Sequence, residues 1–245
     1  MSSFLDNLSE VRERVSRAAE RSGRPPGDVR LIAVTKTVDI SLIREAMAAG
    51  LCEFGENRVQ EAMAKAPQLP SHITWHLVGT LQRNKARHAV GLFSMVHSLD
   101  SAELARELDR RAAAAGVVMD VLLQVNVARE PQKSGVAPES AADLLRAASG
   151  YGNLRVRGLM VMAPFSTDPE AARPCFPQGR QLLSELGAMN LPGVDMGQLS
   201  MGMSGDFEVA IEEGATMVRI GSALFGPRPA PAVDGDGWGA RIVEP

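Results

Sequence analysis

Lys36 is the residue of this chain with the clearest capacity for chemistry. It ends an apolar, strand-like run, Leu31-Ile32-Ala33-Val34-Thr35-Lys36. In an extended strand Ile32, Val34 and Lys36 share one face, so the amine emerges from the apolar side where the strand ends. A buried amine is costly to desolvate unless something uses it, so this placement is compatible with a catalytic amine. The alternative is a strand-end lysine whose stem packs on the strand while its amine reaches water.

A second candidate site lies near the C-terminus, where small residues end two strand-like runs. Ser200 and Ser204 belong to residues 199–206, and Gly221 and Ser222 follow residues 217–220. Exposed backbone N–H groups and a helix start can face an anion at such turns, and the serines add hydroxyl donors, so the pattern favours a phosphate site. The alternative is that these residues serve only the geometry of the turns.

Arg219 connects the two candidate sites chemically. It lies among apolar residues, and a buried guanidinium needs an acceptor. A lysine, a phosphate-holding turn and an arginine form a consistent pattern for pyridoxal 5′-phosphate (PLP). The amine would form a Schiff base with the aldehyde, and a group facing the ring nitrogen would tune the ring as an electron sink.

These residues must be positioned by a fold in which strands and helices alternate. An amphipathic helix begins near Leu5, and Asp39 is expected to cap a helix after the Lys36 strand. Strand-like runs start near residues 31, 52, 73, 95, 120, 154, 196 and 217, each followed by a helix or a turn toward one. Eight such units in one domain predict an α/β fold, a single (β/α)8 TIM barrel with an extra N-terminal helix. The candidate residues would then share the rim that carries active sites in this fold.

Two further expectations concern the elements. An open doubly wound sheet is the alternative fold, but no G-x-G-x-x-G follows the first strand. Pro174 and Pro177 are expected to prevent a regular helix before Gln178.

Several sequence blocks resemble the pyridoxal phosphate homeostasis protein family. They are V-T-K (34–36), F-G-E-N-x-V-Q-E (54–61), W-H-x-x-G-x-L-Q-x-N-K (75–85), K-S-G (133–135), R-G-L-M (157–160), L-S-M-G-M-S-x-D (199–206) and M-V-R-I-G-x-x-x-F-G (217–226). The blocks run in collinear order from about residue 30 to Gly226. The departures from the family pattern lie in residues 173–177 and in the C-terminal tail, away from the candidate site.

The resemblance implies a barrel similar to the N-terminal domain of alanine racemase, with Lys36 holding PLP as a Schiff base. It implies that Arg219 faces the pyridine nitrogen, and that Ser200, Gly221 and Ser222 hold the phosphate. An arginine at that position disfavours protonation of the ring nitrogen and weakens the electron sink.

Three more residues match the family blocks with less definite roles. Asn57 and His76 are expected near the rim, although His76 is open to the alternative of a histidine satisfied within the barrel. Lys85 is a candidate for a second cofactor contact, and the basic helix around it is otherwise a solvated face.

The function expected from this resemblance is to bind PLP and maintain the intracellular pools of PLP and amino acids, without efficient catalysis. A PLP-dependent amino-acid racemase is the main alternative. It needs a second acid–base residue opposite Lys36, for which His76 is the one candidate. A Schiff-base aldolase or phosphosugar enzyme without PLP is a third possibility, weakened by the absence of an evident carboxylate beside Lys36.

Composition sets the remaining expectations. The chain has 245 residues, 45% hydrophobic residues, a formal net charge of −3 and two cysteines. These values fit one soluble domain, with no pull toward nucleic acid or membrane and no disulfide framework or metal site. With no secretory signal or membrane-spanning run, the expected location is the cytoplasm. We expect a barrel domain over residues 1–228, a Pro- and Gly-rich tail over 229–245, PLP-dependent apoenzymes as candidate partners, and a monomer.

Overall fold

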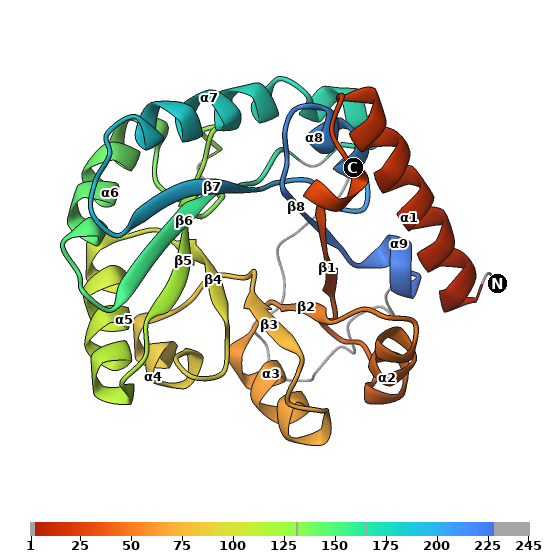
Figure 1. The fold of residues 1–245 in the computed structure, drawn as a ribbon, viewed down its shortest axis with the longest axis horizontal. Coiled ribbons are helices and arrows are strands. Elements are labelled where there is room, and N and C mark those ends of the chain that lie inside the picture. The colour runs from red at the N-terminus through yellow and green to blue at the C-terminus, as the bar shows by residue number, and fades with distance from the viewer. Residues whose placement is uncertain (1–2, 131, 165, 228–245) are drawn as a thin grey trace.

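The eight predicted strands form one closed parallel barrel. The computed structural model describes residues 3–130, 132–164 and 166–227. The strands follow one another around the barrel in sequence order, and β8 pairs with β1 (Figure 1). They are β1 Arg30–Val34, β2 Glu53–Glu56, β3 Thr74–Leu77, β4 Met95–Leu99, β5 Met119–Val125, β6 Leu154–Val161, β7 Val194–Ser200 and β8 Met217–Ile220. The predicted fold class is confirmed.

Helices surround the barrel on its outside. They are α1 Phe4–Arg21, α2 Ile40–Ala48, α3 Val59–Lys65, α4 Ala86–Ala89, α5 Ala102–Ala115, α6 Ala141–Ser149, α7 Cys175–Gly187, α8 Phe207–Glu212 and α9 Ser222–Phe225. Asp39 caps α2 as predicted, because its carboxylate accepts from Ser41 N–H at 2.8 Å. In the described ranges, no helix has both the length and the apolar character that a membrane crossing requires.

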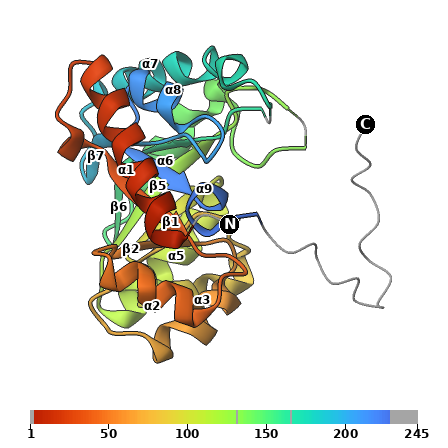
Figure 2. The same ribbon diagram turned by 90° about the vertical axis from the view of Figure 1, so that its right-hand side faces the viewer.

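The extra N-terminal helix packs across the last barrel units. A capping box between Ser3 and Asp6 starts α1, and its apolar stripe includes the buried residues Leu8, Val11 and Val15. Figures 1 and 2 show α1 running along the outside of the barrel beside α8 and α9, which have only six and four residues. The longer helix packs against these two short helices of the last barrel units.

One expectation about α7 is wrong. The helix begins at Cys175 and includes Pro177 in its first turn. The N–H groups of a first turn have no partner within the helix, so a proline there removes no helical hydrogen bond. The predicted boundary at residue 228 and the tail 229–245 lie outside the described residues.

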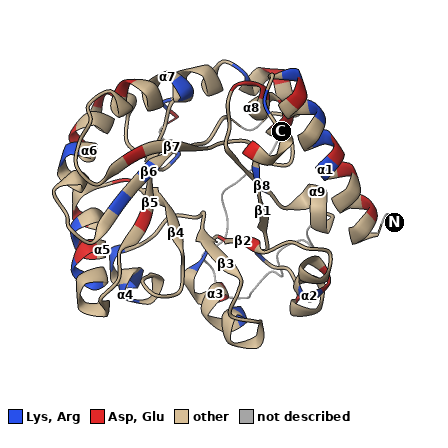
Figure 3. Ribbon diagram, viewed as in Figure 1, with Lys and Arg blue, Asp and Glu red and all other residues tan. Residues whose placement is uncertain are grey.

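Part of the barrel interior is an apolar cluster. Ile32, Met95, Leu122, Met160 and Met217 form one cluster there, separate from the larger core between strands and helices. Figure 3 shows charged residues on several strands as well as on the outer helices, where both signs are interspersed. The register pairs Ile32 with Arg219 across the β1–β8 seam, which brings Arg219 next to the strand that ends at Lys36.

Candidate functional site

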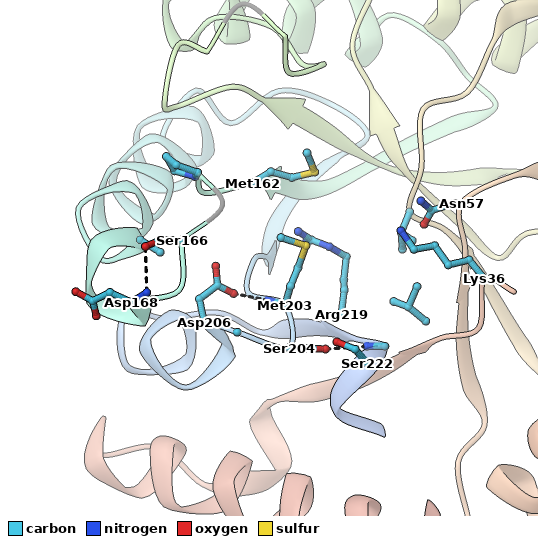
Figure 4. A pocket seen from close by; sticks show the side chains of 16 residues that line it. Lys36, Asn57, Met162, Ser166, Asp168, Met203, Ser204, Asp206, Arg219 and Ser222 are labelled. Carbon is cyan, nitrogen blue, oxygen red and sulfur yellow. Dashed lines mark hydrogen bonds between the residues drawn. The ribbon is translucent and has the colours of Figure 1, made fainter. Parts of the chain in front are cut away.

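A cavity of ≈ 430 Å³ lies at the carboxyl ends of the strands. Its lining includes six of the predicted site residues, Lys36, Asn57, Ser204, Arg219, Gly221 and Ser222 (Figure 4). Small-molecule sites in proteins are typically about 300–1,000 Å³. The structure therefore brings most of the candidate residues together in a space of suitable size.

The backbone around Lys36 is held on both sides. Thr35 C=O accepts from Lys65 Nζ at 2.7 Å, and Thr37 N–H donates to Glu61 Oε2 at 3.2 Å. Thr37 has φ 62°, a left-handed conformation that is strained for a β-branched residue. Such strain persists where surrounding contacts impose it, as it does here in the turn directly after the candidate amine.

A buried carboxylate supports the same turn from behind. Glu56 is fully buried, and its Oε1 accepts from Thr35 Oγ1 and from Lys65 Nζ, both at 2.7 Å. Burial raises the pKa of the Glu56 carboxyl, against the opposing hydrogen bonds from Lys65 and Thr35. The group connects the end of β2 to the end of β1 and thereby fixes where Lys36 leaves the strand.

Asn57 enters the cavity because β2 and β3 come very close where they end. A Cβ added at Gly79 would lie 2.2 Å from the backbone oxygen of Asn57, so only glycine permits this approach. The glycine of the W-H-x-x-G block therefore positions the asparagine of the F-G-E-N block.

The turn at the end of β8 presents hydrogen-bond donors to the cavity. Ser204 Oγ accepts from the backbone N–H groups of Gly221 and Ala223, each at 3.2 Å. Its own O–H can therefore donate toward the cavity, beside Ser222 at the start of α9. This arrangement suits an anionic group.

Arg219 is buried beneath the cavity, with 4% exposure. It donates to Ser200 Oγ at 2.6 Å and to the carbonyl of Val161 at 3.0 Å. Burial lowers the pKa of Arg219 to about 10, an effect that the Asp206 carboxylate partly offsets. The guanidinium therefore stays charged at neutral pH and held in one orientation.

Two predicted site residues lie outside the cavity lining. Ser200 is fully buried, and its hydroxyl faces Arg219 and His97 rather than the cavity. His76 is 1% exposed and lies beside His97 and Glu53 inside the barrel, as the alternative of a histidine within the barrel expects, but its Nε2 has no partner in hydrogen-bond geometry.

Sequence reasoning missed His97, Glu53 and Asp206. Asp206 lines the cavity and accepts from Met203 N–H at 2.6 Å, and burial raises the pKa of its carboxyl. The signal for His97 was its place between Met95 and Leu99 in a strand buried throughout, where a period of two puts it on the same face as Met95.

The chain has close relatives among characterised proteins. It matches the family "Alanine racemase, N-terminal domain" over residues 7–229. The pyridoxal phosphate homeostasis protein of Aquifex aeolicus is 45% identical over 224 residues, 91% of this chain and 97% of that protein. The protein of the same name from Pseudomonas aeruginosa is 45% identical over 229 residues, 93% of this chain and 97% of that protein.

A solved structure agrees with these relatives. PipY of Synechococcus elongatus, with PLP bound, is 43% identical with a TM-score of 0.76, covering 88% of this chain and 100% of that chain. The collinear blocks and the closed barrel point to the same family. The chain therefore belongs to the pyridoxal phosphate homeostasis protein family, built on the alanine racemase N-terminal domain.

Proposed function

We propose that this protein binds PLP covalently at Lys36 and maintains the supply of PLP in the cytoplasm, without efficient catalysis of its own. The observation that carries the proposal is one cavity lined by Lys36, Arg219 and the Ser204–Gly221–Ser222 turn. When bound, PLP supplies an aldehyde that the Lys36 amine attacks, which forms a C=N bond and releases water. PLP-dependent apoenzymes are the proposed recipients, and the protein is proposed to act as a monomer.

The residues present fit this cofactor. Ser204 O–H and the backbone N–H and hydroxyl of Ser222 would hold the phosphate at the turn that Gly221 forms, because the Gly221 N–H is donated to Ser204. Arg219 would donate to the pyridine nitrogen, and Asn57 would contact the ring side of the cavity beside Lys36. Ser200 takes a supporting role in this proposal, because its hydroxyl is engaged by Arg219.

The arrangement favours holding PLP over transforming amino acids. A charged arginine at the pyridine nitrogen disfavours protonation of the ring, and so weakens its capacity to stabilise a carbanion. Tyr151, the single tyrosine, precedes β6 and so lies toward the opposite end of the barrel from the cavity. His76 is enclosed within the barrel. The racemase alternative therefore has no evident second acid–base residue in the described part of the site.

Absorption spectra with borohydride reduction test this function. Purified wild-type protein incubated with PLP is expected to show the visible band of a Schiff base, which borohydride fixes on the peptide that contains Lys36. Lys36→Ala should lose the band. Lys85→Ala is the matched control, since Lys85 lines a different cavity, and should keep it.

A racemisation assay on the same preparations separates the alternatives. We expect no amino-acid turnover at enzyme-like rates. Such turnover would favour the racemase, whereas a wild-type protein that stays colourless with added PLP would overturn both functions.

A further inference from the structure

A line of buried polar side chains crosses the barrel beneath Arg219. Ser200 Oγ lies 3.0 Å from His97 Nδ1, and His97 Nε2 lies 3.0 Å from His76 Nδ1. His76 Nε2 in turn lies 3.0 Å from Glu53 Oε2. The five side chains come from β8, β7, β4, β3 and β2, and lead from the cavity to the amino-terminal ends of the strands.

One assignment of donors and acceptors runs the whole line in a single direction. Ser200 Oγ accepts from Arg219 Nη1, so its own hydrogen can be donated to His97 Nδ1. His97 must then carry its proton on Nε2, facing His76 Nδ1 as an acceptor. His76 then carries its proton on Nε2, which lies 3.0 Å from Glu53 Oε2, at ion-pair distance but outside hydrogen-bond geometry. In this assignment each group donates away from the cavity, and each histidine carries one ring proton.

The charges around the line fit this assignment. Burial holds the pKa of His97 well below its usual value, and the positive charges of Arg219 and Arg30 act in the same direction. Burial opposes ionisation of Glu53, but His76 and Arg30 outweigh it, so its pKa is lowered. Arg30 lies 3.7 Å from Glu53 and is 38% exposed, which puts this end of the line near solvent.

Arg219 has no carboxylate among its hydrogen-bond acceptors in the described residues, which are a hydroxyl and a carbonyl. A buried cation needs compensation, and aligned hydrogen bonds polarise one another in a low dielectric. Asp206 offsets part of this cost, and Glu53 adds a second negative charge at the far end of the line. With both histidines neutral in this assignment and Arg219 protonated, the line transfers no proton. It orients the Arg219 guanidinium and places the Glu53 charge at its other end.

We propose that Ser200, His97 and His76 are positioning residues that connect Arg219 to Glu53, and that the Glu53 charge keeps Arg219 aligned for the pyridine nitrogen of PLP. The proposal rests on the proposed function for its ligand. Under this proposal, side chains of the barrel interior that do not line the cavity contribute to the affinity for PLP.

The first test needs no cofactor. Nitrogen-15 NMR of the histidine rings in the apoprotein is expected to show His97 and His76 as neutral Nε2–H tautomers. His97 should remain neutral at pH values well below the ordinary histidine pKa of about 6.5. Exposed His72, one of four histidines, serves as the titrating reference. A proton on His97 Nδ1, or titration of His97 together with His72, would overturn the proposal.

The second test is a double-mutant cycle read out as PLP affinity. Glu53→Gln replaces the carboxylate by a neutral amide, which can donate as well as accept. The negative charge is lost, and the direction of the hydrogen bonds along the line is no longer imposed. We expect PLP binding to weaken about two- to tenfold, the value of one hydrogen bond. In a Ser200→Ala background, where the line is already broken, Glu53→Gln should cause no further loss.

Asp120→Asn is the matched control. Asp120 is 27% exposed against 22% for Glu53, sits near the same end of the barrel and pairs with Arg157 rather than with the line. Its substitution should leave PLP affinity within about twofold of wild type. Equal effects of Glu53→Gln and Asp120→Asn, or additive effects of Glu53→Gln and Ser200→Ala, would overturn the proposal. Failure of wild type to bind PLP would instead overturn the proposed function, with the NMR result still deciding whether the line exists.

Discussion

Ser204 shows how one side chain can organise an anion site. Its oxygen accepts from two backbone N–H groups, those of Gly221 and Ala223, and so holds the turn that begins α9. The same hydroxyl retains a proton that can be donated into the cavity. In the proposed function that proton meets the phosphate, whereas the ring and the aldehyde lie with Arg219, Asn57 and Lys36.

Ser204→Ala is expected to weaken PLP binding about tenfold, or ~1.4 kcal/mol, as for a lost hydrogen bond to a charged group. Pyridoxal, which lacks the phosphate, should bind the variant and wild type equally. Titration of both ligands by absorbance measures the two effects. Ser9→Ala on the exposed side of α1 is the control and should change neither affinity. An equal loss for both ligands would place Ser204 away from the phosphate.

At the scale of elements, two strand ends meet where they form the cavity wall. Gly79 after β3 and Asn57 after β2 approach so closely that an added Cβ would meet backbone rather than a flexible side chain. The position of Asn57 therefore depends on the absence of a side chain in the neighbouring segment.

Gly79→Ala is expected to displace Asn57, since the new Cβ would otherwise lie 2.2 Å from its carbonyl oxygen. The cost should be about 1–3 kcal/mol in unfolding free energy, as for overpacking, with a loss of PLP affinity. Chemical denaturation and PLP titration provide the two measurements. Gly27→Ala, where an added Cβ meets nothing within 4 Å, is the matched control. Wild-type affinity in Gly79→Ala would show that the approach does not matter to the site.

The elements were more predictable from sequence than the contacts between them. Strand periodicity located Lys36 and Arg219 because local side-chain alternation determines which residues face inward. The role of Ser200 was not predictable, since its partner His97 is 103 residues away and meets it only when β4 and β7 face each other across the barrel. The start of α7 was predicted wrongly because Pro177 was treated as an interior proline, whereas it lies in the first turn.

At the scale of the whole molecule, α1 joins the first segment of the chain to the last barrel unit. Phe4 stacks on Phe225 with ring centroids 5.5 Å apart, and Asn7 donates to the carbonyl of Leu224 at 3.0 Å. Arg14 pairs with Glu208 on α8 at 2.6 Å. These contacts hold the short helices α8 and α9 against α1. The stability of the barrel and the position of the turn at Ser222 are therefore expected to depend on α1.

Two leucines of α1 that differ in burial make this dependence measurable. Leu8 is 2% exposed and Leu5 is 53% exposed, so the same Leu→Ala change removes core packing at one position and surface at the other. Leu8→Ala should cost about 2–5 kcal/mol and lower Tm by roughly 5–15 °C. Leu5→Ala should stay within about 0.5 kcal/mol of wild type.

Thermal unfolding with and without PLP then shows how far the effect of α1 reaches. Because α1 holds α9, and α9 begins at Ser222 in the cavity lining, Leu8→Ala should also lessen the Tm increase that PLP produces in the wild type. If Leu8→Ala loses stability but keeps the full increase of Tm with PLP, α1 stabilises the fold without affecting PLP binding. Equal losses of stability for Leu5→Ala and Leu8→Ala would contradict the packing of α1 itself.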